Sequence, residues 1–167
     1  MVYYEGFEQK LSEGIDNNGS EKKEPAGEIR PPLPQPEKIP QSVRILIAED
    51  HPVNQKLIKA MLTHAGYQVE LVDNGKTAVE TFCASSENFD MIIMDVQMPE
   101  MDGLAATKRI RAEGFDQIPI IALTAHAMEG DRENCLAAGM NDYITKPIRK
   151  QNVIELIDHW VLKRNGS

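Results

Sequence analysis

The sequence predicts an α/β protein with a three-layer, doubly wound, five-stranded parallel sheet. From residue 42 onward, five short apolar runs alternate with five segments whose apolar residues recur at helical spacing. Apolar runs this short, bounded by turn-forming residues, are typical of strands buried on both faces of a sheet. Strict alternation of strand and helix favours parallel strands joined by right-handed crossovers, with helices covering both faces.

The strands are expected at residues 43–48, 67–72, 91–94, 119–123 and 142–145. Helices are expected between them, at about 52–66, from Gly75 to about 83, at about 103–111 and 128–138, and finally around 153–161. Pro52 suits the first position of a helix. Gly139 follows the fourth helical segment and is suited to its C-terminal cap.

Composition restricts the possible functions. The 167 residues allow one ordinary domain and some excess. A formal charge of -8 argues against a direct nucleic-acid binder or a binder of anionic membranes. No apolar run approaches the length of a membrane span, and the N-terminus lacks the basic-then-apolar order of a signal peptide. A soluble cytoplasmic domain without a membrane segment is therefore expected.

Cys83 and Cys135 are the only cysteines and lie far apart, each within an expected helix. Free, buried thiols in a reducing compartment are the interpretation that fits this spacing. Two isolated cysteines also argue against a structural zinc site.

Residues 1–41 differ in composition from the rest and are predicted to form a largely disordered linker. Phe7, Leu11 and Ile15 recur every four positions, so a short helix at 3–15 is possible. Leu33, surrounded by prolines, could act as a ligand for an aromatic groove of another protein, but a plain spacer is the favoured interpretation. The segment holds six of the ten prolines: Pro25, Pro31, Pro32, Pro34, Pro36 and Pro40.

Polar residues stand where four of the expected strands end. Glu49 and Asp50 follow the first strand, Asp95 the third and Thr124 the fourth, and Lys146 follows the fifth. Each has an ordinary structural explanation, as a helix cap, a turn residue or a solvated lysine. Because the carboxyl ends of parallel strands share one edge of the sheet, where such folds bind ligands, their coincidence favours a functional site.

The chemistry of that site follows from charge. Three neighbouring carboxylates repel one another, and a hard divalent cation such as Mg²⁺ relieves the repulsion. A phosphoryl group on Asp95 fits this arrangement, because Mg²⁺ and Lys146 would neutralise its oxygens and the Thr124 hydroxyl would donate a hydrogen bond. Asp95 would then be a nucleophile that forms an acyl phosphate.

These residues, in this order, resemble a response-regulator receiver domain over residues 42–163, which leaves 164–167 as a tail. The segments AEDHPVN at 48–54, LTAHAM at 123–128 and GMNDYITKP at 139–147 resemble receivers found at the C-terminus of hybrid sensor histidine kinases. The resemblance implies a flavodoxin-like fold with strand order 2-1-3-4-5. The matching pairs are Glu49-Asp50, Met98-Pro99 after Asp95, Asp102-Gly103, Thr124-Ala125 and Lys146-Pro147.

The resemblance implies a role for each acidic residue. Asp95 would accept phosphate from a phosphohistidine on a histidine kinase or a histidine-phosphotransfer protein. Mg²⁺ would be held by Asp50, Asp95 and the backbone carbonyl of Gln97, with Glu49 acting through water. Lys146 would contact the phosphoryl group.

The resemblance also implies a switch. Thr124 would move toward the phosphate and Tyr143 would rotate inward behind it. This movement would couple Asp95 to the surface formed by the fourth helix, the fifth strand and the fifth helix. The bond between Lys146 and Pro147 is expected to be cis.

Two features depart from the commonest family pattern. Glu49 is longer by one methylene than the usual first acid, which keeps the charge but can alter metal geometry. Gln97 and His126 stand two residues after the phosphoacceptor and two after the threonine, beside the path of an attacking water. We hypothesise that they tune the lifetime of the phosphate; the alternative is a solvent-facing pair without a kinetic role.

Other functions remain open. An aspartate-nucleophile phosphatase would need a second acid at position 97, where Gln97 stands. A flavodoxin-like cofactor binder would need a phosphate-binding loop where Glu49 and Asp50 stand. A receiver-like interaction domain that is never phosphorylated is a further alternative. Because only seven residues follow Trp160, the expected output is binding or phosphotransfer rather than DNA regulation or enzyme activity on another substrate.

Overall fold

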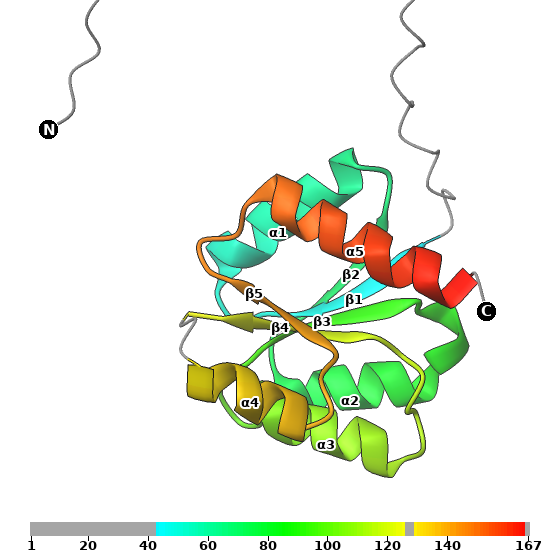
Figure 1. The fold of residues 1–167 in the computed structure, drawn as a ribbon, viewed down its shortest axis with the longest axis vertical. Coiled ribbons are helices and arrows are strands. Elements are labelled where there is room, and N and C mark those ends of the chain that lie inside the picture. Colours follow the sequence, from blue (N-terminus) through cyan, green and yellow to red (C-terminus); the bar gives the residue numbers. More distant parts are fainter. Residues whose placement is uncertain (1–42, 126–128, 166–167) are drawn as a thin grey trace, which may run out of the picture. The chain divides into compact units, whose positions relative to one another are not determined.

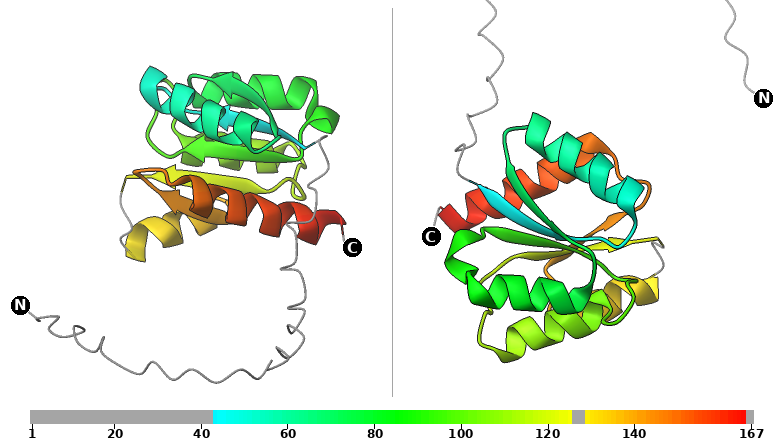
Figure 2. Two further views of the ribbon diagram at one scale, coloured as in Figure 1. Left: turned by 90° about the horizontal axis from the view of Figure 1, so that it is seen from above. Right: turned by 180° about the vertical axis from the view of Figure 1, so that it is seen from behind.

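The computed structural model describes residues 43–125 and 129–165. A five-stranded parallel sheet in the order β2-β1-β3-β4-β5 forms its middle layer. Helices α1 and α5 cover one face, and α2, α3 and α4 cover the other (Figures 1 and 2). The predicted three-layer α/β fold and its strand order are confirmed. The predictions for residues 1–41, His126 and the last two residues lie outside the described part of the chain.

Each strand starts or ends within about one residue of the predicted position. The three central strands are buried almost throughout, as their apolar sequences predict, because helices cover them on both sides. β2 and β5 form the two edges and are only partly buried. The strands are β1 (Arg44–Ala48), β2 (Gln68–Val72), β3 (Met91–Asp95), β4 (Ile120–Thr124) and β5 (Asp142–Thr145).

Local capping residues explain several helix boundaries. Asn74 precedes α2 and accepts a hydrogen bond from the backbone N of Thr77, at 2.8 Å. Gly139 adopts a φ of +99° after α4, a conformation that favours glycine. No helix in the described residues is long and apolar enough to cross a membrane. The helices are α1 (Pro52–His64), α2 (Gly75–Ala84), the 3-10 helix η1 (Ser86–Asn88), α3 (Gly103–Ala112), α4 (Glu129–Ala137) and α5 (Lys150–Asn165).

Two hydrophobic cores form because side chains alternate along each strand. In β1, Ile45 and Ile47 pack toward α1 and α5, whereas Leu46 and Ala48 pack toward α2 and α3. The sheet is thereby fixed on both faces, and the polar residues that follow its strands are held on a rigid support.

Arg111 joins three segments on the side of α3. Its guanidinium donates to the backbone oxygens of Gly139 at 3.0 Å, Phe115 at 2.5 Å and Ile118 at 2.9 Å, and to Oδ1 of Asn141 at 3.0 Å. Burial lowers the pKa of this guanidinium from its ordinary value. A planar group with five donors can satisfy four acceptors at once, which a lysine cannot.

One prediction about the cysteines is wrong. Cys135 is buried, and burial raises the pKa of its thiol, but Cys83 is exposed. The apolar face of α2 consists of Ala78, Val79 and Phe82. Cys83 follows Phe82 directly, so a rotation of about 100° around the helix turns it away from the sheet.

Gly103 provides a test of the packing beneath the sheet edge. A Cβ atom at this position would lie 2.1 Å from the backbone oxygen of Asp95. We expect Gly103→Ala to lower the free energy of unfolding by about 3 kcal/mol, because backbone atoms cannot move aside cheaply. Urea denaturation measures the change. Gly130→Ala in α4 is the matched control: a Cβ there meets no atom within 4 Å, so this variant should equal or slightly exceed the wild type.

Candidate functional site

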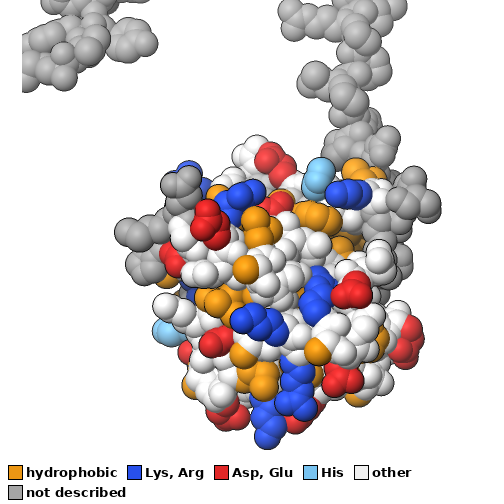
Figure 3. All heavy atoms as spheres, turned by 60° about the horizontal axis from the view of Figure 1, so that its bottom comes forward, with side chains coloured by type: hydrophobic (Ala, Val, Ile, Leu, Met, Phe, Trp, Pro, Cys, Tyr) orange, Lys and Arg blue, Asp and Glu red, His pale blue; other side chains and the backbone are white. Residues whose placement is uncertain are grey.

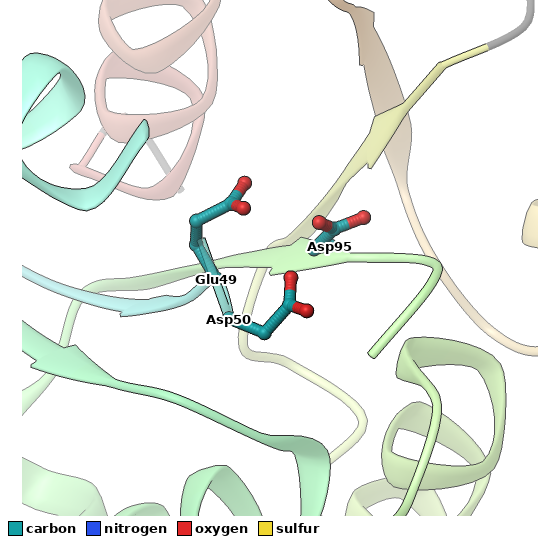
Figure 4. Close-up of side chains that lie close together, drawn as sticks. All are labelled: Glu49, Asp50 and Asp95. Atoms are coloured by element: carbon teal, nitrogen blue, oxygen red, sulfur yellow. The ribbon is translucent and has the colours of Figure 1, made fainter. Parts of the chain in front are cut away.

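The carboxyl ends of the central strands bring three carboxylates together. Asp95 is the last residue of β3, while Glu49 and Asp50 follow β1, its neighbour in the sheet. One ligand oxygen from each of the three lies within 4.8 Å of the others. Figure 4 shows the three side chains converging above the strand ends. The predicted convergence of these acids is therefore present in the structure.

Glu49 is fully buried. Its Oε1 accepts hydrogen bonds from the backbone N of His51 and from Nδ2 of Asn54, both at 3.1 Å. Burial raises the pKa of this carboxyl. These donors and the nearby Lys146 ammonium lower the pKa by more than burial raises it, so it lies below its ordinary value. Glu49 is therefore held as a carboxylate although it has no contact with solvent.

Lys146 supplies the countercharge. Its Nζ lies 2.5 Å from Oδ2 of Asp95 and 2.9 Å from Oε2 of Glu49, and 23 % of its side chain is exposed. Burial lowers the pKa of this ammonium, but its interactions with the carboxylates of Asp95 and Glu49 outweigh burial and raise it. The lysine is thus an ion-pair partner and not a solvated surface group. The Lys146–Pro147 peptide bond is cis, as expected.

Asp95 is 4 % exposed, and its Oδ1 accepts a hydrogen bond from the backbone N of Gln97 at 3.0 Å. Burial raises the pKa of this carboxyl, and Lys146 and the Gln97 amide lower it only in part. Repulsion from Glu49 adds to the effect of burial, so the pKa lies above its ordinary value. Relative to the protonated form, the ionised form of Asp95 is therefore less favoured in the folded protein than in water.

The donor set fits a hard divalent cation. Asp50 is exposed, so an ion can reach the cluster from solvent. Oε2 of Glu49 is buried and makes no hydrogen bond of acceptable geometry among the described residues, although the Lys146 ammonium is near it. Three carboxylates face one ammonium, which leaves excess negative charge. Oxygen ligands and excess negative charge are what Mg²⁺ prefers.

The expected switch residues lie on the two neighbouring strands, β4 and β5. Thr124 ends β4 and is buried, and its backbone oxygen accepts a hydrogen bond from the backbone N of Lys146 at 2.8 Å. Tyr143 in β5 is half-buried and packs against the core on the α2–α4 side. Gln97 is exposed, and with Thr124 and Asp131 it lines a cavity of about 60 Å³. His126 lies outside the described residues.

Two residues of α1 that the sequence analysis missed also support the site. Nδ2 of Asn54 contacts the Glu49 carboxylate, and Nε2 of Gln55 donates to the Glu49 backbone oxygen at 2.6 Å. Pro52 at the start of the helix places both amides on its first turn, so their spacing could have indicated the contact. The residue that caps this helix is His51, whose side chain makes no capping hydrogen bond. Neither Glu49 nor Asp50 is that cap.

Comparison with protein families agrees with this geometry. The family model described as the response regulator receiver domain matches residues 45–158, more than half of the chain. The chain belongs to this family. It is similar to receiver domains of hybrid sensor histidine kinases, and its acidic pocket is consistent with a phosphoacceptor.

Two curated relatives illustrate the similarity. Hybrid signal transduction histidine kinase I of Dictyostelium discoideum is 44 % identical over 131 residues, which cover 75 % of this chain and 7 % of that protein. Signal transduction histidine-protein kinase BarA of Escherichia coli K12 is 42 % identical over 126 residues, covering 75 % of this chain and 14 % of that protein. The chain thus spans a small part of the length of these relatives.

Solved structures extend the comparison. The receiver domain of the sensor histidine kinase PA1611 from Pseudomonas aeruginosa has 48 % identity and a TM-score of 0.65, with coverage of 72 % of this chain and 98 % of that one. That structure contains a magnesium ion coordinated in the active site cleft. The receiver of Saccharomyces cerevisiae Ssk1, solved with the histidine phosphotransfer protein Ypd1, has 29 % identity and a TM-score of 0.68, with coverage of 72 % and 90 %.

The raised pKa of Asp95 predicts a cost to stability. Without metal, in EDTA at pH 7, Asp95→Asn should raise the free energy of unfolding by roughly 1 kcal/mol, because it removes a charge that burial disfavours. The folded pKa of Asp95 lies above the unfolded one, so wild-type stability improves as the pH falls through the folded pKa, and the difference from the variant shrinks. Urea denaturation at pH 7 and pH 5 measures both effects.

The control for this experiment is Glu133→Gln, which also removes one carboxylate charge but at an exposed position in α4. It should leave the stability within about 0.5 kcal/mol of the wild type. Added Mg²⁺ should stabilise the wild type more than Asp95→Asn. If Asp95→Asn is less stable than the wild type at pH 7, the pairing of the Asp95 carboxylate with Lys146 outweighs the cost of burying its charge.

Proposed function

We propose that Asp95 of this receiver accepts a phosphoryl group from a phosphohistidine. The observation that carries the proposal is the position of its carboxylate, which ends a buried strand beside Lys146 and two further acids. One Asp95 oxygen would attack phosphorus while the bond between phosphorus and the donor imidazole breaks. The products are an acyl phosphate on Asp95 and a neutral histidine on the donor, whose imidazole leaves with the proton carried by its other ring nitrogen, so the transfer balances without another reactant.

Mg²⁺ is the proposed cofactor, held by Asp50, Asp95 and the backbone carbonyl of Gln97, with Glu49 acting through water. When bound, it supplies positive charge beside the phosphoryl oxygens. The magnesium ion in the related receiver from Pseudomonas aeruginosa supports this assignment. Glu49 contributes a charge that Lys146 and Asn54 hold in place, and its extra methylene is accommodated through that network.

Lys146 and Thr124 would stabilise the transferred group. The Lys146 ammonium already contacts Asp95, so it would exchange part of that contact for a phosphoryl oxygen. The Thr124 hydroxyl would donate a hydrogen bond to another oxygen. Because the Thr124 backbone accepts from Lys146, a displacement of one residue strains the other.

The output would pass to the surface of α4, β5 and α5. Ala122 and Thr124 of β4 pair with Tyr143 and Thr145 of β5 in register, so movement at Thr124 acts on the strand that carries Tyr143. Tyr143 is half-buried, which leaves its ring free to populate inward and outward packings. Phosphorylation would shift the population toward the inward packing and change the surface offered to a partner.

The proposed donor is a histidine kinase or a histidine-phosphotransfer protein in the cytoplasm. The solved complex of a related yeast receiver with Ypd1 supports this class of partner. Acidic and basic side chains are interspersed on the face shown in Figure 3, and the overall charge is -8, which disfavours nucleic acid. The domain would act as a phosphoacceptor that also promotes its own dephosphorylation, and not as an enzyme on other substrates.

Phosphorylation by a small donor tests the assignment of Asp95. With acetyl phosphate and Mg²⁺, the wild-type chain should incorporate one phosphoryl group, and Asp95→Asn should lose at least about 100-fold of the labelling because the nucleophile is gone. Asp116→Asn, which changes an exposed acid in the same way, should be labelled like the wild type. Phosphate incorporation is measured by intact mass. Equal labelling of Asp95→Asn and wild type would refute the proposal.

The lifetime of the acyl phosphate tests the hypothesis about His126 and Gln97. His126→Ala should shorten it by about threefold or more, because loss of the imidazole opens the path of an attacking water. Release of phosphate after removal of the donor measures the rate. His64→Ala, an exposed position in α1, is the control. A rate unchanged in His126→Ala would leave His126 without a kinetic role.

A further inference from the structure

The amino-terminal edge of the sheet carries a hydrophobic pocket that the phosphoacceptor site does not use. The pocket has a volume of about 240 Å³ and lies between η1 and the segment that joins α3 to β4. Its inner wall is aromatic: the Phe82 ring lies 6.2 Å from Phe89 and 5.1 Å from Phe115, centroid to centroid. Glu87 and Asp116, both exposed, stand at its rim. A pocket with an apolar interior and an acidic rim favours a ligand that carries an apolar side chain next to a basic one.

Arg44 connects this pocket to the beginning of the domain. It is the first residue of β1, and its guanidinium carbon lies 5.2 Å from the centre of the Phe89 ring. The Arg44 backbone N also donates to Oδ2 of Asp90 at 2.9 Å. The start of β1 therefore lies at the edge that holds the pocket, because Arg44 contacts Phe89 and Asp90, the two residues that follow η1.

We propose that this pocket binds the chain's own segment 36–40, Pro-Glu-Lys-Ile-Pro, with Ile39 as the inserted side chain. Ile39 precedes Arg44 by five residues, which span about 16 Å when extended. That length is sufficient to reach the Phe89 ring, whose centre lies 5.2 Å from the Arg44 guanidinium carbon. Lys38, next to Ile39, places its ammonium toward Glu87 and Asp116 at the rim, so the charges of segment and pocket are complementary.

The composition of the segment suits an extended ligand. Pro36 and Pro40 restrict φ at both ends, and the residue before each proline is biased toward extended conformations. An extended, proline-flanked peptide that inserts an apolar side chain into an aromatic groove is a recurring mode of recognition. The flanking prolines also reduce the conformational entropy that binding would otherwise cost.

Covalent attachment favours this occupant over a free partner. A short tether holds Ile39 near the pocket at an effective concentration of the order of millimolar, and closing so short a loop costs little entropy. A separate peptide of the same composition would have to compete at that concentration. Docking would fix the direction in which the chain leaves the receiver, at the edge opposite Asp95.

Nuclear magnetic resonance of the full chain tests the inference. The wild type is compared with Ile39→Ser, with Ile29→Ser as the matched control ten residues upstream, and with Ile39→Val, which keeps an apolar β-branched side chain. Ile39→Ser should shift the backbone amide resonances of residues 86–89 and 114–118, and Ile29→Ser should not. Ile39→Val should remain close to the wild type. These amides are distant in sequence from residue 39, so their shifts report contact rather than local change.

Three outcomes would overturn the inference. Pocket amides that are the same in wild type and Ile39→Ser would show that the segment does not dock. Equal shifts in Ile29→Ser and Ile39→Ser would show that the position of the isoleucine is irrelevant. If the differences between the pocket amide resonances of the wild type and those of Ile39→Ser disappear when the protein is diluted, a second copy of the chain fills the pocket. Phosphorylation of Asp95 is not needed for any of these measurements, so the result is independent of the proposed function.

Discussion

The ion pairs of Lys146 are the interaction on which the site depends. One ammonium, itself three-quarters buried, contacts two carboxylates that have almost no exposure to water. Removing the ammonium would leave both buried carboxylates uncompensated in a medium where charges are expensive. The lysine can reach both acids only because β5 lies beside β4 and its carboxyl end lies at the same edge as those of β1 and β3. The ion pairs of the site therefore require this order of strands.

The single lysine does not neutralise the cluster completely. It draws the pKa of Glu49 below its ordinary value but leaves that of Asp95 above it, although both carboxylates touch the same Nζ. The difference arises because Glu49 also receives hydrogen bonds from His51 and Asn54, whereas Asp95 receives one from Gln97 and is repelled by Glu49. The residue with the least support for its charge is the proposed nucleophile. Functional residues commonly lower the stability of the fold in this way, and stabilising interactions elsewhere in the structure compensate.

Sequence reasoning predicted the layers and the polar residues at the carboxyl edge, because these depend on periodicity and on the position of a residue relative to a strand end, whereas the strand order followed from the resemblance to receiver domains. It missed contacts that depend on the path of a long side chain. Arg111 reaches the segment after α4, and periodicity carries no information about that contact. The burial predicted for Cys83 is wrong because a position within a helix does not settle which way the side chain faces, and Cys83 lies one residue beyond the apolar face of α2.

The two edges of the sheet differ in how they transmit change. At the carboxyl edge, the hydrogen bond from Lys146 to Thr124 ties the reacting group directly to the pairing of β4 with β5. At the amino edge, the rings of the aromatic pocket pack in one hydrophobic cluster with Ile92 and Ile120, which are fully buried. The pocket lies at the end of these strands opposite Asp95, and its lining residues are separate from the acidic cluster. A segment docked at the amino edge would therefore set where the receiver is held, while phosphate at the other edge sets which surface it presents.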